Sequence, residues 1–239
     1  QRWRKSTAST KEEEDINVDE ANEITGGLST TSKMPCKSYS IPSAMCFTGS
    51  RLKKVKGSTC EHCYTYRYAR YQHVIDKQIQ RVRCITNPRW VEAMVVLLKN
   101  ENNPFFRWHD SGDIQDVKHL EDIVEVTRQT PEIMHWLPTL ETRILYKYAD
   151  LHGTFDQYPN LVIRLSTPMI NAKANTGIAH SLGVVSSRVV KEKNLAKQTL
   201  KVLDERNICP SKTEKHGGKC LECRKCWDKE HLVVGYIYH

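Results

Sequence analysis

The sequence has no long apolar stretch and rather few aromatic residues. Hydrophobic residues make up 39% of its 239 residues, and Phe, Trp and Tyr together make up only 8%. No apolar run reaches the roughly 18 to 20 residues that a membrane-spanning helix needs, and the N-terminus has no apolar signal-peptide region. We therefore expect a soluble, cytoplasmic protein without a membrane partner.

Acidic residues are also outnumbered. The chain has 36 Lys and Arg but only 28 Asp and Glu, which gives a formal net charge of +8. Residues 1–24 hold four basic and seven acidic side chains, so the rest of the chain carries +11. A basic body attracts polyanions such as nucleic acid, but it is equally compatible with a protein that has no such partner. Because residues 1–24 have almost no large apolar side chains, we predict a flexible charged tail there.

Strands and helices alternate along the rest of the sequence. Short apolar segments predict strands at residues 38–41, 105–108, 133–137, 161–165 and 184–190. Amphipathic segments predict helices at 64–84, 89–99, 116–130 and 191–206, and a further helix that follows Glu141 and ends at Tyr148. This alternation is typical of an α/β fold with a parallel sheet, in a barrel or an open arrangement. We expect an α/β core domain over 25–206 and a cysteine-rich metal-binding segment over 207–239.

A first group of cysteines consists of Cys46, Cys60 and Cys63, the last two separated by two residues directly before a predicted helix. In a cytosolic protein such a spacing predicts metal ligation rather than a structural disulfide. Three thiolates would leave one iron of a four-iron cluster open to a substrate or cofactor. The spacing also permits a redox disulfide, or a zinc site completed by His62, His73 or Cys36.

A second group lies near the C-terminus, where ten, two and two residues separate Cys209, Cys220, Cys223 and Cys226. Four thiolates in so short a span predict one metal site. Cysteines at successive two-residue gaps wrap well around a 4Fe–4S cluster, whereas a structural zinc site is the alternative. Cys36 and Cys84 belong to neither group.

Polar residues follow the predicted strands, where parallel α/β folds carry their chemistry. His109, Asp110 and Asp113 follow the strand predicted at 105–108 and are candidates for proton transfer. The alternatives are that Asp113 caps the next helix and that His109 is a hydrogen-bonded core residue. Candidates for binding a cofactor occur at the later strands, where Arg164 could equally pair with an acid; they are Thr139, Glu141, Arg164 and Ser166.

Several short motifs occur in order over about residues 28–239. They are Lys33-Met34, Ser38-Tyr39-Ser40-Ile41-Pro42, Cys46, Gly49, Gly57-Ser58, Cys60-x-x-Cys63-Tyr64, Pro88-Arg89-Trp90-Val91, Arg107-Trp108-His109-Asp110-Ser111-Gly112-Asp113, Trp136-Leu137-Pro138-Thr139 and the final cysteine-rich segment. In these motifs the sequence resembles the bacteriophage gene product 88 family, which is similar to radical S-adenosylmethionine proteins.

The resemblance implies a parallel-stranded partial (β/α) barrel of radical S-adenosylmethionine type. It implies that Cys46, Cys60 and Cys63 hold a 4Fe–4S cluster and that Ser111 and Gly112 help to bind S-adenosylmethionine. The gap between the first two cysteines, thirteen residues here, is longer than is usual in that superfamily.

Rings and cations interleave after the first cysteine group. Bases can stack on such rings while cations meet phosphates, which favours a nucleic-acid surface. The alternative is that half of the tyrosines face the core and the cations form a solvated face. The residues are Arg51, Lys53, Lys54, Lys56, Tyr64, Tyr66, Arg67, Tyr68, Arg70 and Tyr71.

Together these features predict a phage-encoded iron–sulfur enzyme in the cytoplasm of the host cell. We expect it to use S-adenosylmethionine for radical chemistry on a nucleic-acid or nucleotide substrate. The alternative is a non-catalytic, zinc-stabilised nucleic-acid-binding protein. The sequence predicts neither the product nor the oligomeric state.

Overall fold

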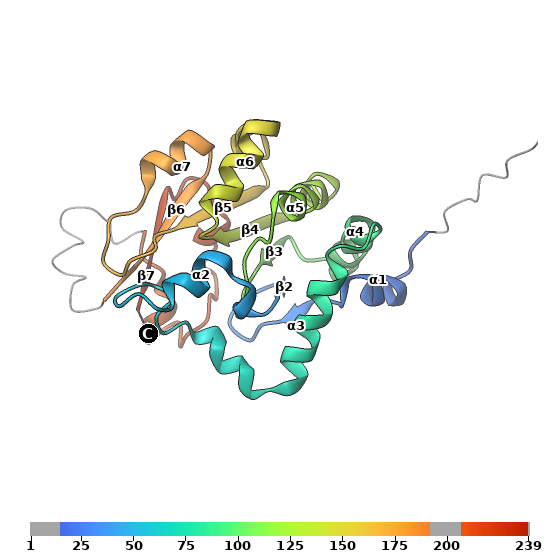
Figure 1. Ribbon diagram of the computed structural model, residues 1–239, viewed down its shortest axis with the longest axis horizontal. Coiled ribbons are helices and arrows are strands. Elements are labelled where there is room, and N and C mark those ends of the chain that lie inside the picture. The colour runs from blue at the N-terminus through green and yellow to red at the C-terminus, as the bar shows by residue number, and fades with distance from the viewer. Residues whose placement is uncertain (1–14, 192–206, 239) are drawn as a thin grey trace, which may run out of the picture.

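The computed structural model describes residues 15–191 and 207–238, and within them the chain forms an α/β fold (Figure 1). Its strands pair in sequential order in one sheet, β1 antiparallel to β2 and all the others parallel to their neighbours. The predicted α/β fold with a mostly parallel sheet is therefore confirmed. The strands are β1 (Ser29–Thr30), β2 (Lys37–Tyr39), β3 (Phe105–Trp108), β4 (Met134–Thr139), β5 (Leu161–Ser166), β6 (Val185–Val190) and β7 (Val233–Ile237).

Helices connect the strands and cover one face of the sheet. Figure 1 shows α4, α5, α6 and α7 side by side above the strands, as sequential parallel strands with crossovers of one hand require. The helices are α1 (Val18–Thr25), α2 (Phe47–Leu52), α3 (Gln72–Cys84), α4 (Trp90–Glu101), α5 (Val117–Gln129), α6 (Thr142–His152) and α7 (Thr176–Leu182). None of the helices within residues 15–191 and 207–238 is long and apolar enough to cross a membrane.

The side chains of strand β3 show what covers each face of the sheet. Phe106 and Trp108 point into the main hydrophobic core beneath the helices, and the Trp108 ring stacks on His135 with 6.0 Å between centroids. Phe105, in the alternate register, packs against Trp227 from the C-terminal segment, 5.5 Å between centroids. Side chains of a strand alternate between faces, so helices cover one face and the C-terminal segment covers part of the other.

The N-terminal segment is more ordered than its composition predicts. Residues 1–14 lie outside the described residues, but α1 occupies most of the remainder of the predicted flexible tail. Asn17 caps this helix by accepting from the Glu20 amide. Ile16 and Ala21 pack on Ala93 and Leu97. A few apolar side chains suffice because α4 provides the surface that they bury.

Two other boundaries differ from the prediction. The helix predicted over 64–84 is interrupted at Tyr71, whose φ of −111° and ψ of 96° are extended, and a 3₁₀ segment (Tyr64–Arg70) precedes α3. The C-terminal segment adds an unpredicted strand to the sheet, because its β7 pairs with β6 over Ser186 to Val190. The helix predicted over 191–206 falls, apart from its first residue, outside the described residues.

Candidate functional site

The loop that carries the first cysteine group is hydrogen-bonded across the carboxyl ends of the strands. The Thr59 amide donates to the Pro168 carbonyl (2.9 Å), and the Ile170 amide donates to the Gly57 carbonyl (2.9 Å), which ties the loop to the segment after β5. The Tyr64 hydroxyl donates to the carbonyl of Asp110, which follows β3 (3.2 Å). The loop therefore lies at the edge where the sequence places the chemistry.

Glu141, which follows β4, fixes the part of the loop that contains Cys46. Its buried carboxylate accepts from the Thr48 amide (2.7 Å) and from the Thr48 hydroxyl (2.8 Å). Thr48 lies in the first turn of α2, and Cys46 is the N-cap of that helix. Glu141 thus holds the helix that positions Cys46, and in the structure it is a positioning residue for the cysteine loop.

Two cysteines of the first group, Cys46 and Cys60, lie beside Gly49. A Cβ atom on Gly49 would lie 3.6 Å from the Cys60 Sγ and 3.7 Å from the Cys46 Sγ, so both sulfur atoms face the glycine. Burial raises the pKa of Cys60 to about 11, and the nearby Cys63 thiolate contributes. Burial also raises the pKa of Cys46, together with the charges of Asp113 and Cys63. The structure therefore brings all three thiols into one electrostatic neighbourhood.

The side chains of the first cysteine group would have to rearrange before they could bind a metal. Within residues 15–191 and 207–238, no group of three or more His, Cys, Asp or Glu side chains is arranged to hold a metal ion. All nine cysteines are free thiols. Because a metal binds the thiolate form, the protonated cysteines must release protons and turn toward the metal. Cysteine thiolates are the usual ligands of iron–sulfur clusters, so the donor type of Cys46, Cys60 and Cys63 fits such a cluster.

Asp113 joins the ends of β3 and β4. Its carboxylate accepts from the Thr139 hydroxyl (2.6 Å), the Leu140 amide (3.0 Å) and the Ile114 amide (2.8 Å). Burial raises its pKa to about 7. The proposed capping role is taken by another residue, because Asp116 accepts from the His119 amide at the start of α5. Thr139 accordingly acts as a partner of Asp113 in the structure.

Gly112 makes a close backbone approach to Ile41. Its φ is +84°, and a Cβ atom there would lie 2.2 Å from the Ile41 Cγ1 and 2.9 Å from the Ile41 carbonyl oxygen. A side chain is therefore excluded by packing within the chain. The neighbouring Ser111 accepts from the Ile41 amide through its carbonyl (3.1 Å), while its buried hydroxyl has no hydrogen-bond partner in the described part of the chain.

His109 is buried in an unusual backbone conformation, with a φ of +50°. Neither ring nitrogen has a hydrogen-bond partner among the described residues, so the alternative of a hydrogen-bonded core histidine does not describe it. Burial holds its pKa well below the usual value, and the ring contacts His119 edge to face at 5.3 Å. Asp110 accepts from the Ser38 hydroxyl (2.6 Å). His109 is thus a buried, neutral imidazole packed against His119.

The comparisons with known proteins give a family and no closer relative. The family model described as gene product 88 matches residues 4–229. The chain belongs to the gene product 88 family. Neither the curated proteins nor the solved structures contain a significant match.

In this gene product 88 family member, Arg164 holds the C-terminal segment. The guanidinium is fully buried on β5 and donates to the carbonyls of Cys226 (3.1 Å), His231 (2.8 Å) and Asp228 (2.7 Å), and further to those of Ser186 and Lys225. These five bonds engage its donors, so Arg164 neither pairs with an acid nor offers a free fork to a cofactor. Ser166, two residues on, lies 3.4 Å from the Ser187 hydroxyl.

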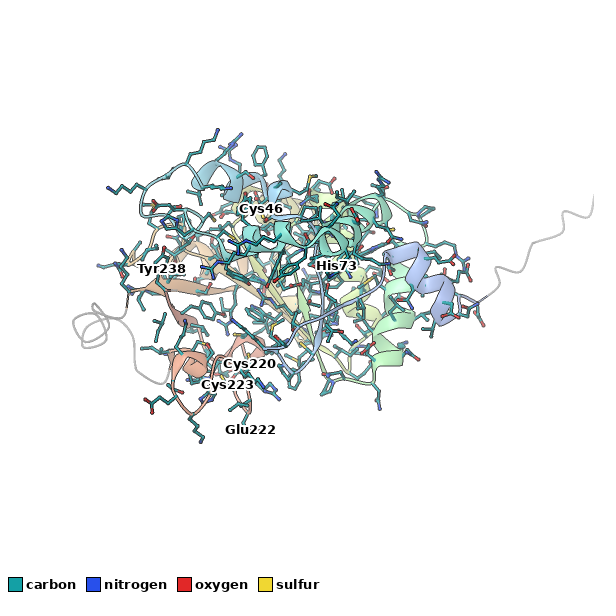
Figure 2. All side chains as sticks on the ribbon, turned by 90° about the horizontal axis from the view of Figure 1, so that it is seen from below. Cys46, His73, Cys220, Glu222, Cys223 and Tyr238 are labelled. Carbon is teal, nitrogen blue, oxygen red and sulfur yellow. The ribbon has the colours of Figure 1, made fainter. Side chains whose placement is uncertain are left out.

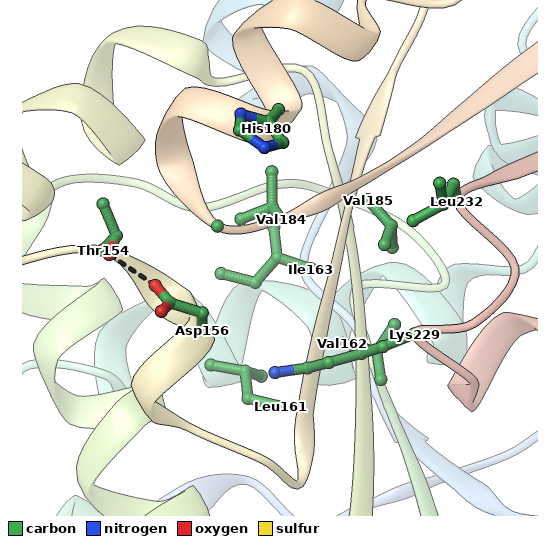
Figure 3. Close-up of a pocket in the computed structure, with 11 residues that line it drawn as sticks. Thr154, Asp156, Leu161, Val162, Ile163, His180, Val184, Val185, Lys229 and Leu232 are labelled. Carbon is green, nitrogen blue, oxygen red and sulfur yellow. Dashed lines mark hydrogen bonds between the residues drawn. The ribbon is translucent and has the colours of Figure 1, made fainter.

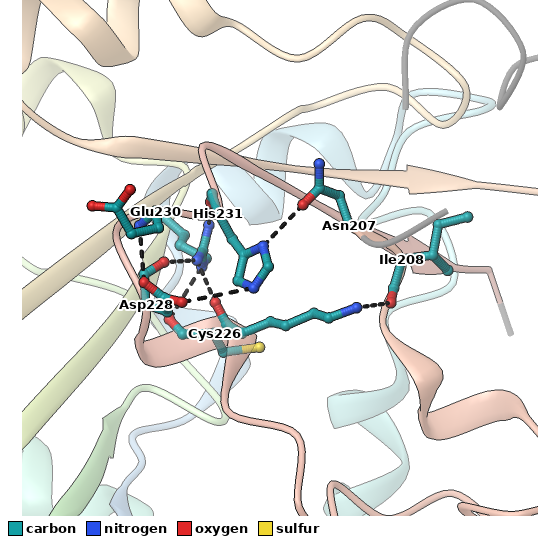
Figure 4. Close-up of polar contacts among 8 residues, drawn as sticks. Asn207, Ile208, Cys226, Asp228, Glu230 and His231 are labelled. Carbon is teal, nitrogen blue, oxygen red and sulfur yellow. Dashed lines mark hydrogen bonds and ion pairs between the residues drawn. The ribbon is translucent and has the colours of Figure 1, made fainter. Parts of the chain in front are cut away.

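The second cysteine group is built into this C-terminal segment. Cys226 packs with Trp136, Trp227 and the unassigned Cys36 in a small hydrophobic cluster. The Cys220 amide donates to the Lys33 carbonyl (2.9 Å). The turn after Cys226 is closed by polar contacts among Asp228, Glu230 and His231, and His231 also meets Asn207 (Figure 4). Figure 2 shows Cys220 and Cys223 well away from Cys46, so the two groups form separate sites.

A pocket of about 460 Å³ lies at the opposite, amino ends of β5 and β6 (Figure 3). Its walls are mainly apolar, among them Ile163, Val184 and Leu232, with Asp156 and Lys229 at the border. None of the site residues predicted from the sequence lines it. Since chemistry in parallel α/β folds occurs at the carboxyl ends, we place the candidate site at the cysteine loop rather than here.

Proposed function

We propose that the protein is an iron–sulfur enzyme that uses S-adenosylmethionine for radical chemistry. The observation that carries the proposal is the loop with three thiols, fixed over the carboxyl edge of a parallel sheet. Cys46, Cys60 and Cys63 would hold a 4Fe–4S cluster whose fourth iron stays open for the cofactor. When bound, the cluster supplies the electron for reductive cleavage of S-adenosylmethionine.

The sheet supports this proposal. Sequential parallel strands with helices on one face match the arrangement of a partial (β/α) barrel, which we propose as the finer description of this fold. In such a fold a cofactor lies at the carboxyl edge, where Ser111 has a buried hydroxyl without a partner. We assign Ser111 to cofactor binding and the neutral His109 to proton transfer. Glu141 orients the loop, and Asp113 holds two strand ends together.

The second cysteine group would hold an auxiliary centre, a 4Fe–4S cluster or zinc. The support is the sequence spacing of Cys209, Cys220, Cys223 and Cys226 and the fixed backbone around them. Cys209 is held by its amide bond to the Gly235 carbonyl (2.8 Å), and the Cys226 Sγ lies 3.2 Å from the Tyr236 hydroxyl. A metal there would fasten the segment that covers the open face of the sheet.

Metal analysis and a cleavage assay test the proposal together. The protein is purified anaerobically, loaded with iron and sulfide, and analysed for iron, sulfide and zinc. Two clusters give about eight irons per chain, and one cluster with zinc gives about four irons and one zinc. With a strong reductant the loaded protein should form 5′-deoxyadenosine from S-adenosylmethionine. Cys60→Ala and Cys63→Ala should each abolish this product and remove about four irons.

Cys84→Ala is the matched control, because Cys84 belongs to neither group and its Sγ contacts the Glu23 carbonyl. It should retain both the metal and the product. About two zincs per chain without any 5′-deoxyadenosine would instead support the zinc-stabilised binding protein and defeat the enzyme proposal.

A further inference from the structure

The surface around the first cysteine group is strongly basic. Residues 42–75 contain six Lys and Arg and a single acid, Glu61. All six cations are exposed, and they extend from α2 along the segment that leads to α3. In Figure 1 this segment runs from α2 along the lower edge of the molecule to α3. The cations are Arg51, Lys53, Lys54, Lys56, Arg67 and Arg70.

Large rings are exposed on the same segment. Phe47, next to Cys46, is 56% exposed, Tyr64, next to Cys63, is 41% exposed, and Tyr71 is 55% exposed. Neither Tyr66 nor Tyr68 is fully buried. Tyr66 and Tyr68, half of the four tyrosines, are thus partly buried, as the alternative expects, whereas Tyr64 and Tyr71 are exposed. Exposed rings on both sides of a group of thiols form a contact surface rather than part of the core.

Rings and cations are paired in space. The Arg51 guanidinium lies 4.1 Å from the centroid of the Phe47 ring, and the Lys53 Nζ lies 3.3 Å from that of Tyr66. The second contact joins the end of α2 to the 3₁₀ segment, so the two parts form one surface. We call the six cations together with Phe47, Tyr64, Tyr66 and Tyr71 the aromatic–basic rim.

We propose that the aromatic–basic rim binds single-stranded nucleic acid, as the substrate of the enzyme proposed above; the inference thus rests on that function. Cations contact phosphates, while exposed rings gain most from unstacked bases. A duplex keeps its bases stacked and leaves the rings without partners. An acidic peptide would satisfy the cations but not the rings.

Fluorescence anisotropy with a labelled, mixed-sequence 20-nucleotide single strand tests the proposal, in the metal-loaded protein without S-adenosylmethionine. The single strand should bind more tightly than its duplex. Phe47→Ala and Tyr71→Ala should each weaken binding by about 5- to 100-fold. The combined change Lys53→Gln, Lys54→Gln and Lys56→Gln should reduce the slope of log K against log salt by about 2.

Matched variants elsewhere on the surface provide the controls. Lys99→Gln, Arg143→Gln and Lys147→Gln together remove the same charge from exposed positions on α4 and α6, and Tyr146→Ala removes a 41% exposed ring. Both should bind the single strand like the parent protein. Equal loss in the rim and control variants, equal affinity for the duplex, or equal competition by polyglutamate would each overturn the proposal.

The binding result and the cleavage result separate the two proposals. Binding of the single-stranded oligonucleotide without any formation of 5′-deoxyadenosine would refute the radical enzyme but support nucleic-acid binding by the aromatic–basic rim. Formation of 5′-deoxyadenosine by a protein that does not bind the oligonucleotide would refute nucleic-acid binding by the rim but support the radical enzyme.

Discussion

The two cysteine groups lie in contrasting surroundings. The first sits on a loop at the sheet edge, fixed by a few hydrogen bonds from Glu141, Pro168 and Tyr64, with exposed rings beside it. The second sits in a segment that packs Trp227 against Trp136 and is held by four hydrogen bonds from Arg164. The first group is thus fastened by a few bonds at the sheet edge, whereas the second is fastened to the sheet through Cys226 and the residues beside it.

We expect the first group to matter mainly for chemistry and the second mainly for the stability of the fold. A site on a lightly fastened loop can lose its geometry while the core remains folded. A site whose backbone is tied to a buried guanidinium cannot lose that tie without exposing several polar groups in the core. Substitutions in the two regions should therefore affect different measurements.

The largest effect is expected for Arg164→Leu. The change removes the donor of five hydrogen bonds to carbonyls, two of them buried and three part-buried, so we expect a loss of about 3–5 kcal/mol in the free energy of unfolding. Denaturant unfolding followed by tryptophan fluorescence measures it. Arg143→Leu on the exposed side of α6 is the control and should change stability by less than about 0.5 kcal/mol. Similar stability of both variants would show that Arg164 does not fasten the segment.

Glu141→Ala tests how the first cysteine group depends on the bonds that fix its loop. It removes both bonds to Thr48 and so releases the start of α2, next to Cys46. We expect iron affinity at the first group to fall by about 10- to 100-fold, while zinc or iron at the second group stays bound. Iron titration followed by absorbance measures the effect. Glu141→Gln keeps an acceptor and should restore part of the affinity; equal iron affinity in Glu141→Ala and the parent would contradict a positioning role.

A buried histidine in the core, outside both cysteine groups, should make the stability of the whole fold depend on pH. Burial lowers the pKa of His135 to about 3, and its ring bonds Trp108 and Thr130. The unfolded chain takes up a proton below about pH 6.5, whereas the folded chain does not, so this contribution is complete above pH 6.5 and declines toward pH 3. Each such histidine contributes a slope of about 1.4 kcal/mol per pH unit in that range.

Denaturant unfolding at pH 7 and pH 5 checks this slope. His135→Gln should lose about 2 kcal/mol less than the parent between these two conditions. Effects of bound metal are shared by the two proteins and cancel in the difference. His180→Gln, exposed on α7, should behave like the parent. An unchanged pH dependence in His135→Gln would show that this ring takes up its proton at the same pH in the folded and the unfolded chain.

Local patterns explain which parts of the fold could be predicted. Strand β3 was predicted with its observed bounds because apolar Phe105 to Trp108 follow Pro104 and end at polar His109. Helix α5 was predicted to within one residue because its apolar side chains share a face and Asp116 precedes them. The polar residues after the strands were placed at the carboxyl edge from topology alone, and the cysteine loop lies at this same edge through its bonds to Pro168 and Asp110.

Long-range contacts could not be predicted. Glu141 and Thr48 are 93 residues apart, and no spacing in the sequence connects them. Arg164 looked like a ligand-binding residue because its carbonyl partners carry no sequence signal. Helix α1 was missed because its few apolar residues become useful only against α4. Gly112 was assigned to a cofactor, although its nearest neighbour in the structure is Ile41.

The smallest effect is expected at the cap of α5, away from both cysteine groups. Asp116 accepts from the His119 amide at 2.8 Å in an extended conformation typical of an N-cap. Asp116→Ala should therefore cost about 1 kcal/mol of stability, and Asp116→Asn, which can still accept, should restore most of it. Unfolding in denaturant measures both variants, and iron and zinc contents are determined in parallel. Because the cap supports a helix that neither cysteine group contacts through these bonds, metal contents should match those of the parent. A loss of iron from Asp116→Ala at unchanged stability would mean that α5 transmits its position to the cysteine loop, and the two regions would then not be independent.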